Sequence, residues 1–503
     1  MIHKLECKVL KIVTGLSTIE TPTGTVDLPL LMEHLRAVLQ VMLQWSHSAD
    51  LRADFESLES NLSAFKAKSG TMEDLGWQVA LACRLLSSLV SEEVKAMAVD
   101  ILARVYTNAL DRTEKSSGQS GICIDATLSM VNHSCLPNAF VAYLGRTAYL
   151  RAQHPIAADD EITICYVESM DPLSERKVCL DIYNFECDCR RCRENLDNYQ
   201  AALISPALSL NTGLYTFFST SSSSPQKIFS IVPSLNLLRN PPVVRQGPDA
   251  VTPQQLEHLY VASSKLSDTD KFDDDDPLQI LRDLWKLCTP LIKANRWVDK
   301  PVVILVTHLA EYCQRVGNYP HMLVVSCFYA QHVIPYLLPA LFETSRNMGL
   351  VGIARAIFQV MEIVKSELPK AQGGDGVKLA REARGQGGPS ADRRRIVDPR
   401  VMEILPSLMD GHLYVAILTM IMNNGPLGHS EKWPLLDTVN LQLDLYFARF
   451  GVDRMASAAT YLYATPSLPQ TKQFFEEHIL DTVNRLSALA PSLMERILKA
   501  GGN

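Results

Sequence analysis

The chain has 503 residues, 47% of them hydrophobic and 20% charged, so it can bury a substantial core and is not compositionally disordered; its length suggests about three domains. Its 48 Lys and Arg residues against 55 Asp and Glu residues give a net charge of −7, which argues against a dominant nucleic-acid-binding surface. The first residues, MIHKLECKVLKIVTG, lack the basic stretch and long apolar run of a secretory signal, so the 12 cysteines are expected to be reduced.

The N-terminal part of the chain predicts helices. Residues 27–45 start with Asp27 as an N-cap and Pro29 in the first turn, and their apolar residues then recur at helical spacing. Residues 73–110 predict a second helical region that Gly and Pro hardly interrupt. The next stretch, TEKSSGQSG at 113–121, is typical of a loop.

The middle of the chain predicts short strands in AFVAYL, RTAYLRA and DEITICYV. Gly145 and Arg146 favour a hairpin between the first two, and residues 155–160 favour another turn. From 203 to 276 the sequence is loop-like, with the biased stretch FFSTSSSSPQK. A second biased stretch, DTDKFDDDDP, lacks the glycine and the ligand spacing of a calcium loop and is interpreted as a solvated acidic run.

The C-terminal part, from residue 277, predicts helices whose lengths suit antiparallel pairs, but it contains no clean tetratricopeptide repeat. Residues 371–395 interrupt it with the glycine content of a flexible linker. The most apolar segment, residues 321–342, includes Gln331, His332 and two prolines, so it predicts a buried helix and not a bilayer span.

Three cysteines lie close together in FECDCRRCRE, namely Cys187, Cys189 and Cys192. Thiolates at this spacing suit a tetrahedral zinc ion better than a disulfide, which needs converging Cβ vectors. A closed structural site needs a fourth ligand, for which Cys135 is the best candidate. The alternative is three incidental cysteines; most of the remaining cysteines lie singly in apolar helical sequence and are expected to fill the core.

A second polar cluster is NHSCLPN, residues 132–138. The residues alone are compatible with a surface turn, a metal site, a nucleophile with its base, or the wall of a pocket. A nucleophilic pair of Cys135 with His133 is disfavoured here, on the expectation that neighbouring strand-like residues point to opposite faces.

Three stretches, NHSCLPN, IAADDEITICYV and YNFECDCRRC, resemble in order and spacing the SET domain and post-SET segment of the SET-and-MYND (SMYD) lysine methyltransferases. Upstream, LESNL at 58–62 looks like the family's helical insertion motif. The resemblance implies an α+β fold: a small β-rich SET domain with a helical insertion and a post-SET zinc segment, followed by an all-α, TPR-like domain. The expected boundaries are 1–8 for a MYND remnant, 9–120 for the insertion region, 121–178 for the SET core, 179–197 for the post-SET segment, 198–276 for a linker and 277–503 for the helical domain.

The start of the chain resembles the end of a MYND zinc finger. His3 and Cys7 match the last two zinc ligands, so the other six would lie upstream, together with the family's first strands and the glycine-containing loop that holds the methyl donor. We therefore expect either an N-terminally truncated reading of a longer gene or a protein that has lost half of its cofactor cradle.

The resemblance also implies the roles of individual residues. S-adenosylmethionine would be bound by Glu59, Asn61, Asn108, Ser129, Val131, Asn132, the backbone of His133, Tyr166 and Phe185. Zinc would be bound by Cys135, Cys187, Cys189 and Cys192. Tyr166 would be the catalytic residue, orienting the lysine amine, and Tyr183 would wall the lysine channel with it. The channel position aligned to Leu110 is usually aromatic in the family, which leaves the degree of methylation open.

The implied chemistry has a physical requirement that these residue types meet. A free lysine has a pKa of about 10.4 and is protonated, so it cannot attack a methyl group. A narrow apolar channel beside a positive sulfonium disfavours the charged amine. The predicted function is a protein-lysine N-methyltransferase that acts on a histone or a non-histone protein. The alternative is a catalytically impaired SET-derived scaffold that binds peptides through its helical C-terminal domain.

The expected partner is a lysine-containing peptide or histone tail. No direct nucleic-acid binding and no membrane are expected, and the protein is predicted to be a monomer. The resemblance is compatible with a nuclear location, a cytoplasmic location or both.

Overall fold

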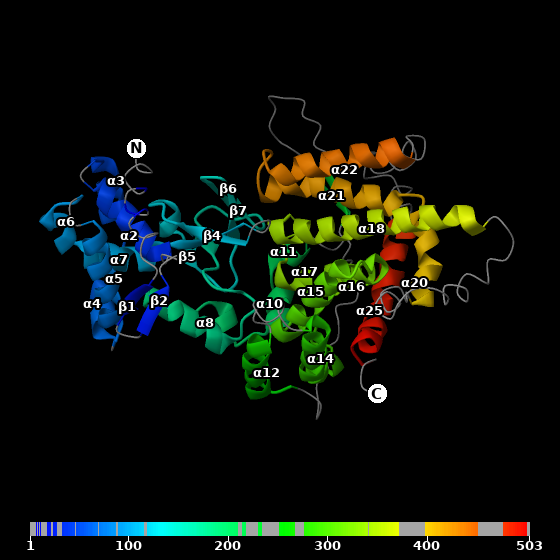
Figure 1. Ribbon diagram of the computed structural model, residues 1–503, viewed down its shortest axis with the longest axis horizontal. Helices are drawn as coiled ribbons and strands as arrows, with labels where there is room; N and C mark the ends of the chain where they lie inside the picture. The colour runs from blue at the N-terminus through cyan, green and yellow to red at the C-terminus, as the bar shows by residue number, and fades with distance from the viewer. Residues whose placement is uncertain are drawn as a thin grey trace. The chain divides into compact units, whose positions relative to one another are not determined.

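The computed structural model describes residues 33–45, 47–68, 70–86, 89–114, 118–209, 251–266, 276–340, 342–371, 398–450 and 476–499, with the short strands at 18–21, 24–27, 214–217 and 230–233 and the single residues 7, 9 and 11. The chain divides into two compact units. The first comprises Met1–Arg146, Ile156–Glu168 and Leu173–Glu194; the second comprises Thr147–Pro155, Ser169–Pro172 and Asn195–Asn503. Figure 1 labels the elements of both.

Helices surround the hydrophobic core of the first unit. They are α2 (Glu33–Gln44), α3 (Ala49–Glu56), α4 (Leu62–Ala67), α5 (Thr71–Leu85), α6 (Glu92–Ala96) and α7 (Ala98–Asn108). In α2 the buried residues Leu35, Val38, Leu39 and Met42 follow the 3–4 spacing of one helical face, and this face packs against α7. The predicted amphipathic period is therefore present.

Two predicted helix boundaries in this unit are wrong. Asp27 is not an N-cap but the last residue of strand β2 (Gly24–Asp27), where it pairs with Thr18 of strand β1 (Thr18–Thr21). The region 73–110 is not one nearly continuous helix, because the chain leaves α5 after Leu85 and starts α6 at an N-cap, Ser91, whose hydroxyl accepts from the backbone of Val94. A serine N-cap can start a new helix even where no Gly or Pro marks the boundary in the sequence.

The predicted loop at 113–121 is also wrong. Strands β3 (Leu110–Glu114) and β4 (Gly118–Cys123) pair there antiparallel, with an irregularity between Asp111 and Thr113. The remaining short elements of the unit are η1 (Leu128–Met130), β5 (Asn132–His133), β6 (Ala139–Leu144), β8 (Thr163–Ile164), α8 (Leu173–Leu180), η2 (Asp181–Tyr183) and α9 (Arg190–Arg193). The turn after β6 contains Gly145 at φ +56°, a left-handed conformation that glycine adopts without strain.

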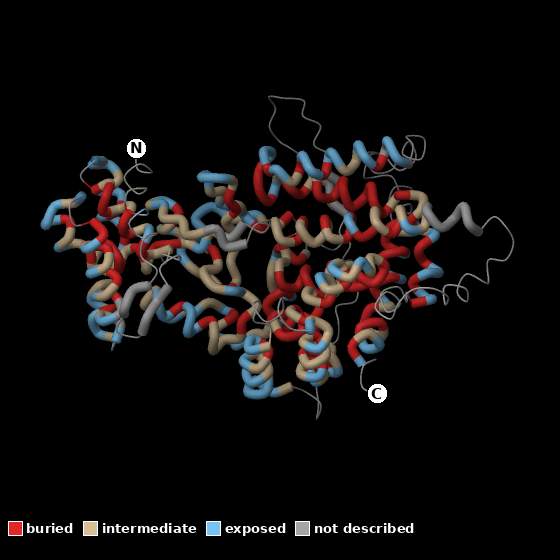
Figure 2. The backbone as a smooth tube through the Cα atoms, in the orientation of Figure 1, coloured by how far each residue is buried: buried red, intermediate tan, exposed pale blue. Residues whose placement is uncertain are grey.

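The second unit is almost entirely helical, as predicted for the residues after 277. It contains β7 (Thr147–Ala152), α10 (Asn198–Leu203), α11 (Pro206–Ser209), β9 (Leu214–Phe217), β10 (Ser230–Pro233), α12 (Pro253–Leu266), α14 (Pro277–Lys293), α15 (Lys300–Arg315), α16 (Tyr319–His332), α17 (Ile334–Leu337), α18 (Thr344–Ala371), α20 (Pro399–Ile404), η4 (Leu405–Leu408), α21 (His412–Gly428), α22 (Pro434–Phe450), η5 (Glu476–Leu480) and α25 (Asp481–Lys499). Figure 2 shows how buried residues concentrate in its inner helices.

The apolar segment 321–342 is the centre of this unit, which confirms the prediction of a buried helix. Helix α16 packs against α15, α18 and α25 and is buried on nearly all sides. By length and composition alone, residues 344–364 of α18 and the bent pair α20–η4 with α21 would suffice to cross a bilayer. Both also meet the description of core helices, since Ile353 and Ile357 of α18 and Ile417 and Ile421 of α21 are completely buried.

The stretch 203–276 contains more helix than predicted, because α12 occupies 253–266. Both biased stretches lie largely outside the described residues. An exception is Asp276, whose side chain accepts from the backbone of Leu278 and caps α14. Residues 372–395 of the predicted glycine-rich linker also lie outside the described part.

We predict a pH dependence of stability that arises from His321 in α16. Its Nε2 accepts a hydrogen bond from the backbone N–H of Asp398 (3.1 Å), which requires a neutral ring, and burial, assisted by Arg496, lowers its pKa to about 4. Because the unfolded chain has the higher pKa, near 6.5, it binds more protons as the pH falls. The stabilisation is therefore complete above pH ~6.5 and is lost as the pH falls through ~4.

Between about pH 7 and pH 5 this histidine is expected to remove about 2 kcal/mol from the free energy of unfolding. Urea unfolding at the two pH values measures this loss. His321→Gln should make the dependence shallower by about that amount, whereas the exposed His258→Gln should leave it unchanged. Equal slopes in wild type and His321→Gln would contradict the prediction.

Candidate functional site

Parallel pairing of two short strands organises the NHSCLPN motif. Asn132 and His133 of β5 align with Thr163 and Ile164 of β8, and the backbone N–H of Ser134 donates to the Ile164 carbonyl (2.9 Å). Asn138 adds two further bonds: its Oδ1 accepts from the backbone N–H of Thr163 (2.8 Å), and its Nδ2 donates to the carbonyl of Glu161 (2.8 Å). The second amide of the motif therefore fixes the segment that leads to Tyr166.

Tyr166 is bound by its backbone to the motif and by its side chain to the residue before that motif. Its hydroxyl donates to the carbonyl of Val131 (2.5 Å), and its backbone N–H donates to Nδ1 of His133 (3.0 Å). A backbone N–H can only donate, so Nδ1 carries no proton and the proton of the neutral ring is on Nε2. Burial, with a smaller contribution from Arg176, lowers the pKa of His133 to about 4, in agreement with a neutral ring.

The same ring contacts the thiol of Cys135, with Nε2 3.2 Å from Sγ. The expectation that these two side chains would not meet is wrong, because residues two apart in an extended chain share a face. The conclusion about nucleophilic catalysis nevertheless holds for a different reason. With Nδ1 occupied by the Tyr166 N–H, Nε2 is a donor to the sulfur and cannot accept its proton.

Aromatic rings gather beside Tyr166. The ring centroid of Tyr183 lies 4.8 Å from that of Tyr166, and Phe185 lies 6.4 Å from Tyr166 and 5.9 Å from His133. Burial, with the nearby charge of Asp111, raises the pKa of Tyr183 to about 12, and burial also raises the pKa of Tyr166. The phenols are therefore neutral donors in a poorly solvated environment, whereas Phe185 is 38% exposed.

The LESNL segment lies against the same site. Glu59 and Asn61 do not lie on a helix but precede α4, with Asn61 in the left-handed conformation at φ 50°. Asn61 donates through Nδ2 to the carbonyl of Tyr183 (3.2 Å), and the buried Asn108 donates through Nδ2 to the carbonyl of Glu59 (2.7 Å). Ser129 donates through its hydroxyl to the carbonyl of Asn108 (2.9 Å). These bonds hold four distant segments of the sequence together.

Two further predicted site residues, Asn132 and Leu110, differ in exposure. Asn132 is exposed, and its Nδ2 donates to Oε1 of Glu161 (2.6 Å). Leu110 is half-buried at the start of β3, paired with Cys123. Cys7 is described only as a single residue, and His3 lies outside the described part, so the predicted MYND remnant is not tested.

The structure brings Cys135 together with Cys187, Cys189 and Cys192. Their four sulfur atoms lie within 4.8 Å of one another, and the Cys135 and Cys192 sulfurs are 3.5 Å apart. The Cys135 thiol donates to Cys189 and lowers the pKa of Cys189 to about 3. Four cysteine sulfurs at this spacing are the donor set of a structural zinc site.

Two buried arginines next to this cluster were not identified from the sequence. Arg176 of α8 and Arg191 of α9 are 2% and 4% exposed and interact electrostatically with Cys135. Four thiolates around Zn²⁺ carry a net charge of about −2, which these two guanidinium groups would compensate. Arg191 is adjacent to Cys192 and could have been suspected, whereas nothing in the local sequence marks Arg176.

A second group of metal-binding residue types, Asp410, His412 and His478, lies within 4.8 Å in the second unit. His478 is exposed, and the Nδ1 of His412 lies 3.2 Å from the Asp410 carboxylate, so an ordinary ion pair accounts for much of this arrangement. No local sequence pattern predicts this group, because His478 is distant in the sequence from the other two residues.

Comparison with known proteins defines the class of the first unit. Residues 30–167 match the model of the SET domain family. The chain thus contains a SET domain, and this range includes the whole NHSCLPN motif and Tyr166.

The similar curated proteins make that domain SMYD-like. The chain is 29% identical over 167 residues to histone-lysine N-methyltransferase SMYD3 of Mus musculus, which covers 31% of this chain and 38% of that protein. It is 31% identical over 138 residues to N-lysine methyltransferase SMYD2-A of Xenopus laevis, covering 27% and 32%. It is 26% identical over 198 residues to SET domain and MYND-type zinc finger protein 6 of Schizosaccharomyces pombe, covering 38% and 36%. The matches thus span less than two-fifths of each relative.

Proposed function

We propose that this protein transfers methyl groups from S-adenosylmethionine to lysine side chains of proteins. The observation that carries the proposal is the Tyr166 hydroxyl, which bonds to the carbonyl of Val131 next to the NHSCLPN motif, within the range that matches the SET domain. The ring of Tyr183, C-terminal to that range, lies 4.8 Å from the ring of Tyr166. Two similar proteins bear the names of lysine methyltransferases, which supports the reaction class.

The residues that would hold the methyl donor are Glu59, Asn61, Asn108, Ser129, Val131, Asn132, His133, Tyr166 and Phe185. Their arrangement fits such a group: Phe185 is 38% exposed and packs beside His133 and Tyr166, so it offers apolar surface next to hydrogen-bonding groups. S-adenosylmethionine would supply an electrophilic methyl group on a sulfonium. The protein would supply alignment and electrostatics.

The aromatic rings would act on the substrate lysine. Its ammonium must lose a proton to solvent before the nitrogen lone pair can form the new N–C bond, as the S–CH3 bond of the sulfonium breaks and leaves a neutral thioether. Enclosure between Tyr166 and Tyr183 would disfavour the charged amine. The Tyr166 hydroxyl, already held by the Val131 carbonyl, is placed to orient the neutral amine. The same faces accommodate a methylated ammonium product.

The cysteine cluster would hold one zinc ion that orders residues 187–192. His133 would donate a hydrogen bond from Nε2 to the sulfur of the ligand Cys135. We predict that His133→Ala lowers the zinc affinity by about 10- to 100-fold while one equivalent still binds at saturation. Competition with a chromophoric chelator measures this change. An unaltered affinity would show that the imidazole contact to the sulfur is incidental.

The proposed substrate is a lysine-bearing protein, histone or other, met in the nucleus or the cytoplasm by a monomeric enzyme. The test is incubation of the full-length protein with S-adenosylmethionine labelled on its methyl group and a cell extract. The expected result is label on protein lysines, resistant to competition by free lysine. Labelling no greater than in an extract without the enzyme would overturn the proposal.

A further inference from the structure

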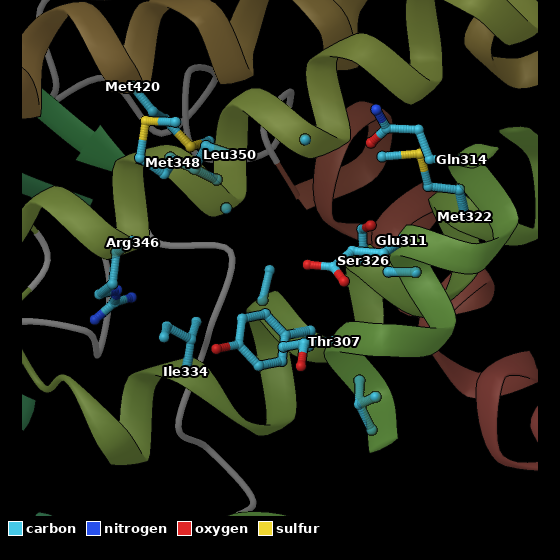
Figure 3. Close-up of a pocket in the computed structure, with 16 residues that line it drawn as sticks. Thr307, Glu311, Gln314, Met322, Ser326, Ile334, Arg346, Met348, Leu350 and Met420 are labelled. Atoms are coloured by element: carbon cyan, nitrogen blue, oxygen red, sulfur yellow. The ribbon is translucent and has the colours of Figure 1, made fainter. Parts of the chain in front are cut away.

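The helical second unit contains a cavity of about 280 Å³ between α15, α16, α18 and α21 (Figure 3). Most of its wall is apolar and includes the side chains of Met322, Met348, Met420, Leu350 and Ile334. An engineered cavity of roughly 150 Å³ lined by such residues binds benzene, so this cavity has room for roughly twice as many non-hydrogen atoms, about a dozen.

Two glycines keep one wall of the cavity open. Gly349 and Gly352 lie inside α18, where glycine is less favourable than alanine. Glycine in a helix often permits close approach of another element, but here no heavy atom lies within 4 Å of the position that a Cβ would occupy at either residue. Their missing side chains therefore leave unfilled space and do not accommodate a neighbouring helix.

A buried cation is the most polar part of the wall. Arg346 is 8% exposed, and its Nη1 donates to the carbonyls of Leu338 (3.3 Å) and Pro339 (3.2 Å). Among the described residues no carboxylate lies within ion-pair distance of it, and its Nε and Nη2 donate no hydrogen bond. Burial lowers its pKa to about 10, so the guanidinium stays charged at neutral pH. The charge of Glu343 favours the cation, and the Nε–Nη2 edge, which makes no hydrogen bond, remains for an anionic ligand.

The charged groups of the wall lie on opposite sides of the cavity. In Figure 3, Glu311 and Gln314 lie on the opposite side from Arg346. Met420, Met348 and Leu350 lie on the Arg346 side, and Met322 lies beside Gln314. Glu311 is exposed and paired with His308 (3.2 Å). An anionic group is therefore attracted to the Arg346 side and repelled from the other.

We propose that this cavity binds an amphipathic monocarboxylate of about a dozen non-hydrogen atoms. The carboxylate would accept both hydrogen bonds of the Nε–Nη2 edge of Arg346, the fork geometry that suits a carboxylate. The aliphatic chain would lie along the methionines, whose unbranched side chains adapt to irregular apolar ligands.

Calorimetric titration of the protein with decanoate, which has 12 non-hydrogen atoms, tests the proposal. The expected Kd is on the order of tens of micromolar, within the range for a ligand of this size. 1-Decanol has the same chain without the charge and should bind at least about tenfold more weakly, because it cannot form the charge-assisted pair. Absence of heat up to millimolar decanoate, or equal affinities for the acid and the alcohol, would overturn the proposal.

Two sets of variants test whether decanoate binds in this cavity. The double variant Gly349→Ala with Gly352→Ala should keep or raise the melting temperature, because alanine favours helix and meets no neighbour, while decanoate affinity falls at least about tenfold. The matched control is Gly76→Ala in α5 of the first unit, where a Cβ also meets nothing within 4 Å; it should leave the affinity unchanged.

A third variant addresses the head group. Arg346→Gln keeps an amide donor for the Leu338 and Pro339 carbonyls and should reduce decanoate binding to the level of 1-decanol, with 1-decanol itself unaffected. If this variant does not fold, the double alanine variant still decides the question: wild-type affinity in that variant would refute the assignment of the site.

Discussion

Tyr166→Phe is expected to lower methyl transfer by the full-length protein by about 100-fold or more while the fold stays intact. The substitution removes a hydroxyl that the carbonyl of Val131 holds at 2.5 Å, beside the ring of Tyr183. Loss of a group that positions the reacting atoms costs about 10² in turnover. The backbone N–H of Tyr166 still donates to His133, so the local chain path should not change.

The measurement is turnover at saturating methyl donor, with circular dichroism to confirm folding. Tyr106→Phe is the matched control, because it also removes a hydroxyl from a hydrogen bond, to Gln78 (3.1 Å), away from the site. The control should keep nearly full activity. Similar turnover in the two variants and the wild type would remove Tyr166 from the mechanism and leave it a structural residue.

Cys189→Ser is expected to abolish zinc binding and to disorder residues 187–192. Four sulfur ligands close the site, and their sulfur atoms lie within 4.8 Å of one another. Structural zinc supplies about 10–16 kcal/mol of binding free energy that is also folding free energy, so loss of one ligand has a large effect. Wild-type protein should contain about one equivalent of zinc and the variant almost none.

Elemental analysis after dialysis gives the zinc content, and limited proteolysis shows whether the segment is ordered. Cys179→Ser is the control, since it makes the same exchange at an exposed position in α8 of the same unit. Zinc content equal to that of the wild type in Cys189→Ser would refute the assignment of the four cysteines.

The sequence predicted the parts of the fold that a local pattern determines. Apolar residues at helical spacing identify α2 and the helices after residue 277, and the apolar run around α16 identifies the core of the second unit. The C-x-C-x-x-C spacing identifies three members of the cysteine cluster, and the order of the motifs supplies Cys135. These features can be recognised because each residue type has few alternative uses.

The errors share a different physical cause, which is that partners distant in sequence decide the outcome. Strands β3 and β4 form in a polar stretch without alternation, because pairing with each other satisfies their backbone groups. Arg176 lies near enough to Cys135 to act on its thiol because of the way the chain folds, not because of its local sequence. The tautomer of His133 depends on the backbone N–H of a residue 33 positions later. The residues next to each of these positions in the sequence do not reveal these distant partners.

A single imidazole therefore connects two chemistries that could have been independent. One nitrogen of His133 holds the backbone of Tyr166, and the other donates its proton to the sulfur of Cys135. A substitution that displaces this ring should therefore alter both the backbone around Tyr166 and the surroundings of the Cys135 sulfur.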